Sequence, residues 1–160
     1  MSELFTFPKT HEPPADLNNF KAQREIHRMM GLLRFSPDKD GVFIARFAPD
    51  HNIIAALAEF FTARFGETPW AIIDEKRGFC LSRKPEKHAG EPVIQLTILD
   101  GNSQKNHAEI ANCVGDHTGD EWEDLWKHYH KTINNEDRDN PNLQRQLMPK
   151  RYWKYLPEVT

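Results

Sequence analysis

Hydrophobic residues recur every three or four positions along the segment 50–65, which is the spacing of one face of an α-helix. The stripe consists of six side chains: Ile53, Ile54, Leu57, Phe60, Phe61 and Phe65. Asp50 stands where an N-cap is expected, and Gly66 stands where a helix often ends. We therefore expect a helix over 50–65 whose apolar face is buried against neighbouring strands.

The same period appears in two other segments. A helix is expected after Asp16, through residue 30, with Asp16 as its N-cap. Another is expected over 118–133, where Thr118 and Glu121 have the spacing of a capping box. Its apolar residues again recur at steps of three and four: Trp122, Leu125, Trp126, Tyr129 and Ile133. Near the end of the chain, Pro141 and Pro149 divide the sequence into two short helices, the second with Pro149 at its first position.

Shorter apolar runs separated by turn residues predict β-hairpins. The runs 32–36 and 42–47 flank a Pro-Asp-Lys-Asp-Gly turn, the runs 70–74 and 79–83 flank a second turn, and 92–98 adds a further strand. Residues 1–16 contain three prolines and show no period, so we expect an extended lead-in to a single domain over 17–160. The predicted fold class is α+β, with a mainly antiparallel sheet of two hairpins, packed helices and a helical C-terminal segment.

Composition is that of a globular protein, since 38% of the 160 residues are hydrophobic and 28% are charged. No apolar run is long enough to cross a bilayer and no signal peptide is apparent, so we expect a cytoplasmic protein. Cys80 and Cys113 are far apart and form no CxxC motif. We expect buried free thiols, no metal site and no cofactor.

Charge is unevenly distributed along the chain. With histidines neutral, residues 1–100 carry 13 Lys/Arg against 14 Asp/Glu, residues 101–139 carry 4 against 9, and residues 140–160 carry 4 against 1. The basic tail also contains three aromatic rings, and two interpretations are open. Aromatic rings can stack on bases while the neighbouring cations contact phosphates, which would make the tail a nucleic-acid-binding surface. Alternatively, Trp153 and Leu156 anchor the tail to the fold while its cations point to solvent.

The sequence contains none of the common nucleotide-binding or hydrolase motifs. Arg24, His27 and Arg28 share one helical face, which could hold a phosphate or simply be solvated. Asp74 could be a catalytic carboxylate, or it could simply form the turn at a hairpin tip. An enzyme would require five polar residues to converge from three segments: His27, Asp50, His51, Asp74 and Arg77.

Three stretches resemble one bacterial family, the domain of unknown function 4130: "HRMMGLLRF", "FAPDHNIIAALAEFFTARFGETPWAIIDEKRGF" and "LWKHYHKTINNEDRDNPNLQRQLMPKRYWKYLPE". The resemblance covers roughly Ala22 to Glu158 and implies a role in DNA metabolism. Proteins of that family resemble partners of radical-SAM DNA-repair proteins, and some are fused to a uracil-DNA-glycosylase-like domain. This chain has neither a glycosylase-like segment nor a CxxxCxxC motif, so base excision and radical chemistry are not carried over.

We therefore expect a non-catalytic module that binds nucleic acid, in this case DNA, or acts as an adaptor in a DNA repair or modification system. A radical-SAM or uracil-DNA-glycosylase-like protein is the implied partner. The expected nucleic-acid-binding residues are Arg28, Arg145, Lys150, Arg151, Tyr152, Trp153 and Lys154. Two alternatives remain open: an enzyme acting on nucleic acid or nucleotides, and a protein-interaction domain that docks a basic partner on the acidic stretch 116–124.

Overall fold

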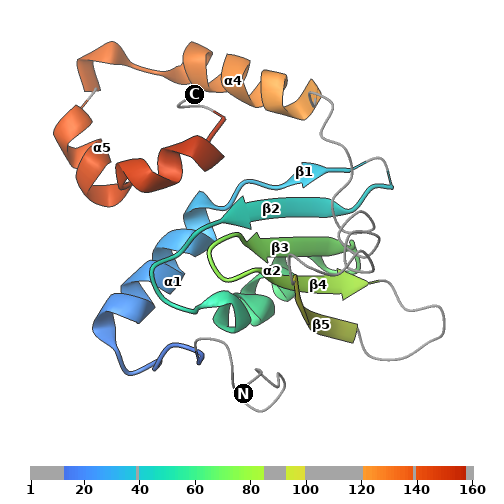
Figure 1. Cartoon of the computed structure of the whole chain (residues 1–160). Coiled ribbons are helices and arrows are strands. Elements are labelled where there is room, and N and C mark those ends of the chain that lie inside the picture. Colours follow the sequence, from blue (N-terminus) through green and yellow to red (C-terminus); the bar gives the residue numbers. More distant parts are fainter. Residues whose placement is uncertain (1–12, 39, 85–92, 100–120, 139, 158–160) are drawn as a thin grey trace.

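The computed structural model describes residues 13–38, 40–84, 93–99, 121–138 and 140–157 (Figure 1). Its elements are α1 (Phe20–Leu32), β1 (Ser36–Pro37), β2 (Phe43–Phe47), the 3-10 helix η1 (Ile54–Leu57), α2 (Ala58–Phe65), β3 (Trp70–Asp74), β4 (Phe79–Lys84), β5 (Val93–Ile98), α4 (Glu121–Ile133), the 3-10 helix η2 (Glu136–Arg138), α5 (Pro141–Leu147) and the 3-10 helix η3 (Lys150–Tyr155).

Five strands form one sheet in the order β1-β2-β3-β4-β5. The second predicted hairpin, β3 with β4, is present, and β5 pairs antiparallel with β4. The first hairpin is much shorter than predicted, because α1 extends to Leu32 and β1 is only Ser36–Pro37. The α+β class and the mainly antiparallel sheet are confirmed. One pair differs, because β2 and β3 run parallel. Parallel neighbours need a crossover connection. Here η1 and α2 provide it (Figure 1).

The crossover supplies much of the hydrophobic core. Ile53, Ile54, Leu57 and Phe61 are at most 1% exposed, and they pack in one cluster with Trp70 and Ile72 of β3. Four residues of the predicted apolar stripe are therefore buried as expected, while Phe60 and Phe65 are partly buried and pack against the same cluster. Burying aliphatic and aromatic side chains of this size contributes about 1.5–3 kcal/mol each relative to exposure, so this contact fixes the crossover on the sheet.

Two helix starts differ from the prediction. Helix α1 begins at Phe20 rather than after Asp16, because the side chain of Asn19 accepts the Lys21 N–H at 3.0 Å and so caps the helix. The predicted helix over 50–65 begins with η1 at Ile54, and no side chain caps it. Ile53 occupies the N-cap position, so Asp50 lies outside the helix, where its carboxylate pairs with Arg151 at 2.6 Å. The end at Gly66 is confirmed, with a φ of 58° that favours glycine.

The C-terminal segment forms short helices and returns to the body of the fold (Figure 1). The predicted helix α4 is present, and the proposed cap Thr118 lies outside the described residues. Asn140 caps α5 by accepting the Leu143 N–H at 3.0 Å. After Pro149 the chain forms the 3-10 helix η3, where Tyr152 and the following Leu156 are 2% and 1% exposed. These two side chains anchor the end of the chain.

In the part of the chain that the structure describes, no helix has the length and hydropathy needed to cross a bilayer. Cys80 is a buried free thiol, as expected, while Cys113 lies outside the described residues.

Candidate functional site

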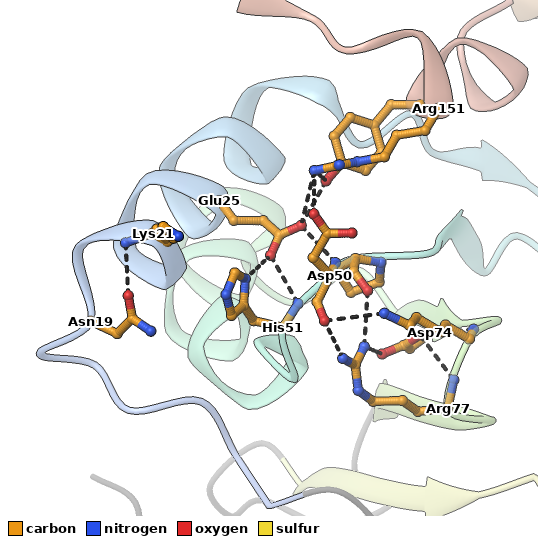
Figure 2. Close-up of polar contacts among 11 residues, drawn as sticks. Asn19, Lys21, Glu25, Asp50, His51, Asp74, Arg77 and Arg151 are labelled. Atoms are coloured by element: carbon orange, nitrogen blue, oxygen red, sulfur yellow. Dashed lines mark hydrogen bonds and ion pairs between the residues drawn. The ribbon is translucent and has the colours of Figure 1, made fainter.

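Two buried carboxylates lie on opposite sides of the loop that connects β2 to η1, residues 48–53 (Figure 2). Glu25 of α1 is 3% exposed and Asp74 at the end of β3 is 0% exposed. A buried carboxylate is tolerated only when hydrogen-bond donors or cations satisfy it. Both carboxylates meet this requirement through contacts that involve the loop.

Glu25 accepts four hydrogen bonds from three residues in two segments of the chain, the loop and the tail. The backbone N–H groups of Asp50 and His51 donate at 2.8 and 3.0 Å, the Nδ1 atom of His51 lies 2.6 Å from Oε2, and the Tyr152 hydroxyl donates to Oε1 at 2.6 Å. Burial by itself would raise the pKa of Glu25. The hydrogen bonds from Tyr152, Asp50 and His51 outweigh burial and lower that pKa. Glu25 is therefore held as a carboxylate.

Asp74 is the second buried carboxylate and lies at the tip of the β3–β4 hairpin. We call Glu25 and Asp74 the two anchors of the loop. It accepts the backbone N–H groups of Lys76 and Arg77 at 2.9 and 3.2 Å, and Arg77 Nη1 donates to it at 3.1 Å. The two backbone contacts confirm its interpretation as a turn-forming residue. Burial raises the pKa of Asp74, and the Arg77 guanidinium opposes that rise. The Arg77 side chain is itself only 4% exposed, so the two groups form a buried ion pair.

Arg77 and Lys76 also hold the carbonyl groups of the loop. Arg77 donates to the carbonyl oxygens of Pro49 and Asp50 at 3.0 and 2.6 Å, and Lys76 Nζ donates to that of Asp50 at 3.2 Å. Glu25 thus accepts hydrogen bonds from the N–H groups of this loop, and two hairpin side chains donate hydrogen bonds to its carbonyl groups. The backbone at Asp50 is thus fixed on both sides, and the side chains of Asp50 and His51 are positioned with it.

The basic tail also contributes to this network, because Arg151 contacts the carboxylates of both Asp50 and Glu25. Arg151 Nη2 lies 2.6 Å from Asp50 Oδ2 and 4.0 Å from Glu25 Oε1, and it donates to the Tyr152 hydroxyl at 2.9 Å (Figure 2). Lys154 and the Tyr155 hydroxyl both contact Glu75, at 3.5 and 2.6 Å. Two of the four tail cations are therefore paired with carboxylates of the fold.

These contacts change the role of several predicted nucleic-acid-binding residues. Tyr152 is not available to stack on a base, because it is buried and its hydroxyl is bonded to Glu25. Trp153 is half-buried, and its Nε1 donates to the Met148 carbonyl at 2.9 Å. Lys150 is exposed and lies 5.8 Å from the centroid of the Trp153 ring. The anchoring interpretation named Trp153 and Leu156, whereas the structure buries Tyr152 and Leu156. It also pairs Arg151 and Lys154 with carboxylates instead of directing them to solvent.

Four of the five residues considered for an enzyme come together around the loop: Asp50, His51, Asp74 and Arg77. His27 does not join them. It lies on the exposed face of α1 and has no hydrogen bond or ion pair with the residues that the structure describes. The pattern of polar residues near Asp50 thus predicted part of this site, and the fold excludes His27 from it.

The central residue, Glu25, was missed by the sequence analysis. A signal for it existed, because Glu25 stands between Ala22 and Met29, three and four residues away on the same buried helical face. A charged residue on such a face needs a buried partner. The sequence does not indicate that Tyr152, 127 positions away, supplies one of its donors.

Within the described ranges, no three His, Cys, Asp or Glu side chains cluster in a way that could hold a metal ion. The arrangement instead offers a positioned imidazole. The Nδ1 atom of His51 faces Glu25, while Nε2 has no hydrogen-bond partner among the described residues, and the side chain is 31% exposed.

No curated protein and no solved structure is significantly similar to the chain. A family model, that of the domain of unknown function DUF4130, matches residues 15–158, which is nearly the whole chain and includes both anchors and the basic tail. The chain therefore belongs to the DUF4130 family.

Proposed function

We propose that this protein is a non-catalytic nucleic-acid-binding module that acts in DNA metabolism in the bacterial cytoplasm, and that α1 carries its phosphate-binding surface. The supporting observation is a set of four side chains on α1: Lys21, Arg24, His27 and Arg28. The first three are exposed and Arg28 is half-buried. None of the four side chains forms a hydrogen bond or ion pair with the described residues. These groups are free to meet phosphates.

The positions of the acidic residues strengthen this surface. Glu25 is the only acid in α1, and it points inward to the loop. The nearby carboxylate of Asp50 is already paired with Arg151. Because these two carboxylates are occupied, they neutralise the positive charges of α1 less than free carboxylates would.

The tail contributes fewer groups to this proposal than its composition indicated. Arg145 and Lys150 are exposed and remain available for phosphates, whereas Arg151 and Lys154 are held by Asp50 and Glu75. Since Arg151 lies against Glu25 of α1, η3 and α1 are neighbours, and the tail cations can extend the surface of the helix. The DNA repair setting and a radical-SAM or glycosylase-like partner remain part of the proposal, supported by the family resemblance.

The proposal predicts salt-dependent binding that depends on α1. We expect Arg24→Ala combined with Arg28→Ala to weaken binding about tenfold or more at low salt and to reduce the slope of log K against log salt by about 1.4–1.8, because two phosphate contacts are lost. The measurement is fluorescence anisotropy of the full chain with single-stranded, duplex and uracil-containing oligonucleotides in a salt titration.

A matched control removes two other exposed cations, Arg64 of α2 and Lys84 of β4, by alanine substitution. This control should retain the wild-type affinity and slope. Equal losses in both double variants, or no binding by the wild type at low salt, would exclude α1 as the phosphate-binding surface. Charge reversal at Arg151 is a poor test, because it also breaks the contacts with Asp50 and Glu25.

One observation favours a second candidate, an enzyme acting on nucleic acid or nucleotides. A buried carboxylate that bonds one ring nitrogen of a histidine orients the ring and leaves the other nitrogen as a proton acceptor, and His51 and Glu25 have this arrangement. The third possibility, docking of a basic partner on residues 116–124, concerns side chains outside the described part of the chain, except that of Asp124.

The enzyme candidate predicts turnover that depends on the free nitrogen of His51. Labelled oligonucleotides and nucleoside triphosphates would be incubated with the wild type and with His51→Gln, and we expect about 100-fold slower turnover in the variant. His130→Gln is the control, because His130 is exposed on α4 and belongs neither to the His51 network nor to the α1 surface, and it should retain full activity. Product formation by the wild type and His51→Gln at equal rates would rule out this role for His51.

A further inference from the structure

Exposed apolar side chains are concentrated on the C-terminal helices. In the described part of the chain, six of the eight large hydrophobic residues that are exposed lie on α4 and α5: Leu125, Trp126, Tyr129, Ile133, Leu143 and Leu147. Between Asp124 and Leu147, every residue whose burial is described is exposed. Apolar surface gathered in this way marks an interaction site more often than scattered single residues do.

On α4 the apolar residues form one face. With 100° per residue, Leu125, Trp126, Tyr129 and Ile133 fall within a sector of about 100°, while Asp124, Lys127, His128 and Lys131 fall on the opposite side. Trp126 and Tyr129 pack together, with ring centroids 5.7 Å apart, and Arg34 lies 5.8 Å above the Trp126 ring. Even with these contacts, Trp126 is 40% exposed and Tyr129 is 51% exposed. The helix therefore presents an amphipathic face whose apolar side is largely uncovered.

We propose that a second copy of this chain covers the face, through antiparallel pairing of α4 with α4 of the partner subunit. The charge pattern of the helix supports this occupant. Its first six residues contain three acids and no Lys or Arg, and its last seven contain two lysines and no acid. Antiparallel pairing places the acidic half of each helix beside the basic half of the other, and it also opposes the two helix dipoles.

The spacing of the aromatic residues is compatible with two-fold symmetry. When the axis passes between Lys127 and His128, Trp126 lies level with Tyr129 of the partner subunit, and the reverse pair follows by symmetry. The exposed part of each ring then gains an aromatic neighbour from the other subunit, and aromatic pairs contribute beyond the area that they bury. Parallel pairing would place like charges side by side along the whole helix, which is unfavourable.

The test compares two neighbouring positions of α4 in the full chain. Tyr129→Asp and His128→Asp introduce the same residue and the same change in formal charge, on the apolar and the polar face respectively. We expect the wild type and His128→Asp to sediment at twice the monomer mass of 18.7 kDa in the micromolar range, and Tyr129→Asp to remain monomeric. Both side chains are exposed in one subunit, so circular dichroism should show that both variants fold.

A monomeric wild type, or equal behaviour of the two variants, would overturn the proposal. Cysteine cross-linking tests the orientation, in a Cys113→Ser background. An equimolar mixture of Trp126→Cys and Tyr129→Cys chains should form mixed disulfide dimers well beyond the twofold excess over either homodimer that random pairing gives. An excess of the homodimers would indicate parallel pairing and would overturn the antiparallel arrangement. Because these readouts involve no nucleic acid, failure of the dimer and failure of DNA binding are distinguishable.

Discussion

Glu25→Ala is expected to lower the free energy of unfolding by about 3–5 kcal/mol, one of the two largest effects of a single substitution that we predict. The substitution removes the acceptor of the Asp50 and His51 N–H groups and of the Tyr152 hydroxyl. Each donor left unsatisfied in a buried place costs about 1–3 kcal/mol. The measurement is the midpoint of urea unfolding at neutral pH, with the slope compared between variants.

Glu59→Ala is the matched control, because Glu59 is exposed on α2 and forms no hydrogen bond or ion pair with the described residues. It should change the free energy of unfolding by less than about 0.5 kcal/mol. If Glu25→Ala were equally mild, Glu25 could not be the anchor that joins α1, the loop and the tail.

The pH dependence of the same anchor has a defined sign. The folded-state pKa of Glu25 is lowered, so its contribution is present above the pKa of an unfolded glutamate, about 4.3, and is lost as the pH falls through the folded value. Glu25→Gln keeps the size of the side chain and removes this titration. The difference in stability between the wild type and Glu25→Gln should therefore be constant near neutrality and shrink on acidification below about pH 5. A difference that does not change with pH would contradict the ionised state of Glu25.

Asp74→Ala is expected to destabilise the protein by a similar amount, about 3–5 kcal/mol, because it leaves the Arg77 guanidinium buried without its carboxylate. The hairpin turn also loses the acceptor for two backbone N–H groups. Since Arg77 holds the carbonyls of Pro49 and Asp50, the loop should loosen as well, and its amide protons should exchange faster with solvent.

A double-mutant cycle separates the ion pair from the turn. Arg77→Met removes the buried cation, and Asp74→Ala in that background should cost about 0.5–3 kcal/mol less than in the wild type. Asp40→Ala is the control, because Asp40 is an exposed acid in the turn between β1 and β2. An Asp74 effect that is the same in both backgrounds would mean that the carboxylate acts only on the turn.

The residues in these two predictions differ in how much of their role could be predicted from the sequence. Asp74 stands in a turn pattern, and its bonds to the N–H groups of Lys76 and Arg77 are local, so its role in the hairpin could be predicted. Arg77 was only a candidate for convergence, and its bonds to Pro49 and Asp50 cross 28 and 27 positions. The position of Glu25 on the buried face of α1 indicates that it needs a partner, but nothing near it in the chain indicates which residues supply one.

The C-terminal segment shows the same limit. Its sequence allowed a surface for nucleic acid or an anchor, and composition could not decide between them. The fold shows that two of the tail cations pair with carboxylates of the protein itself, because Arg151 contacts Asp50 and Lys154 contacts Glu75. It leaves Arg145 and Lys150 exposed, so the proposed phosphate-binding surface moves mainly to α1.

Local periodicity was sufficient to predict the hairpin of β3 and β4, the turn between β1 and β2, the further strand, the largely buried stripe of 53–65 and helix α4, because each depends on neighbours a few residues apart. Tertiary structure alone determined the parallel pairing of β2 with β3, the start of η1 after Asp50, and the burial of Tyr152 against Glu25. These features depend on which distant groups meet when the core closes. A hydrogen bond between residues 127 positions apart leaves no periodic signal in the sequence that forms it.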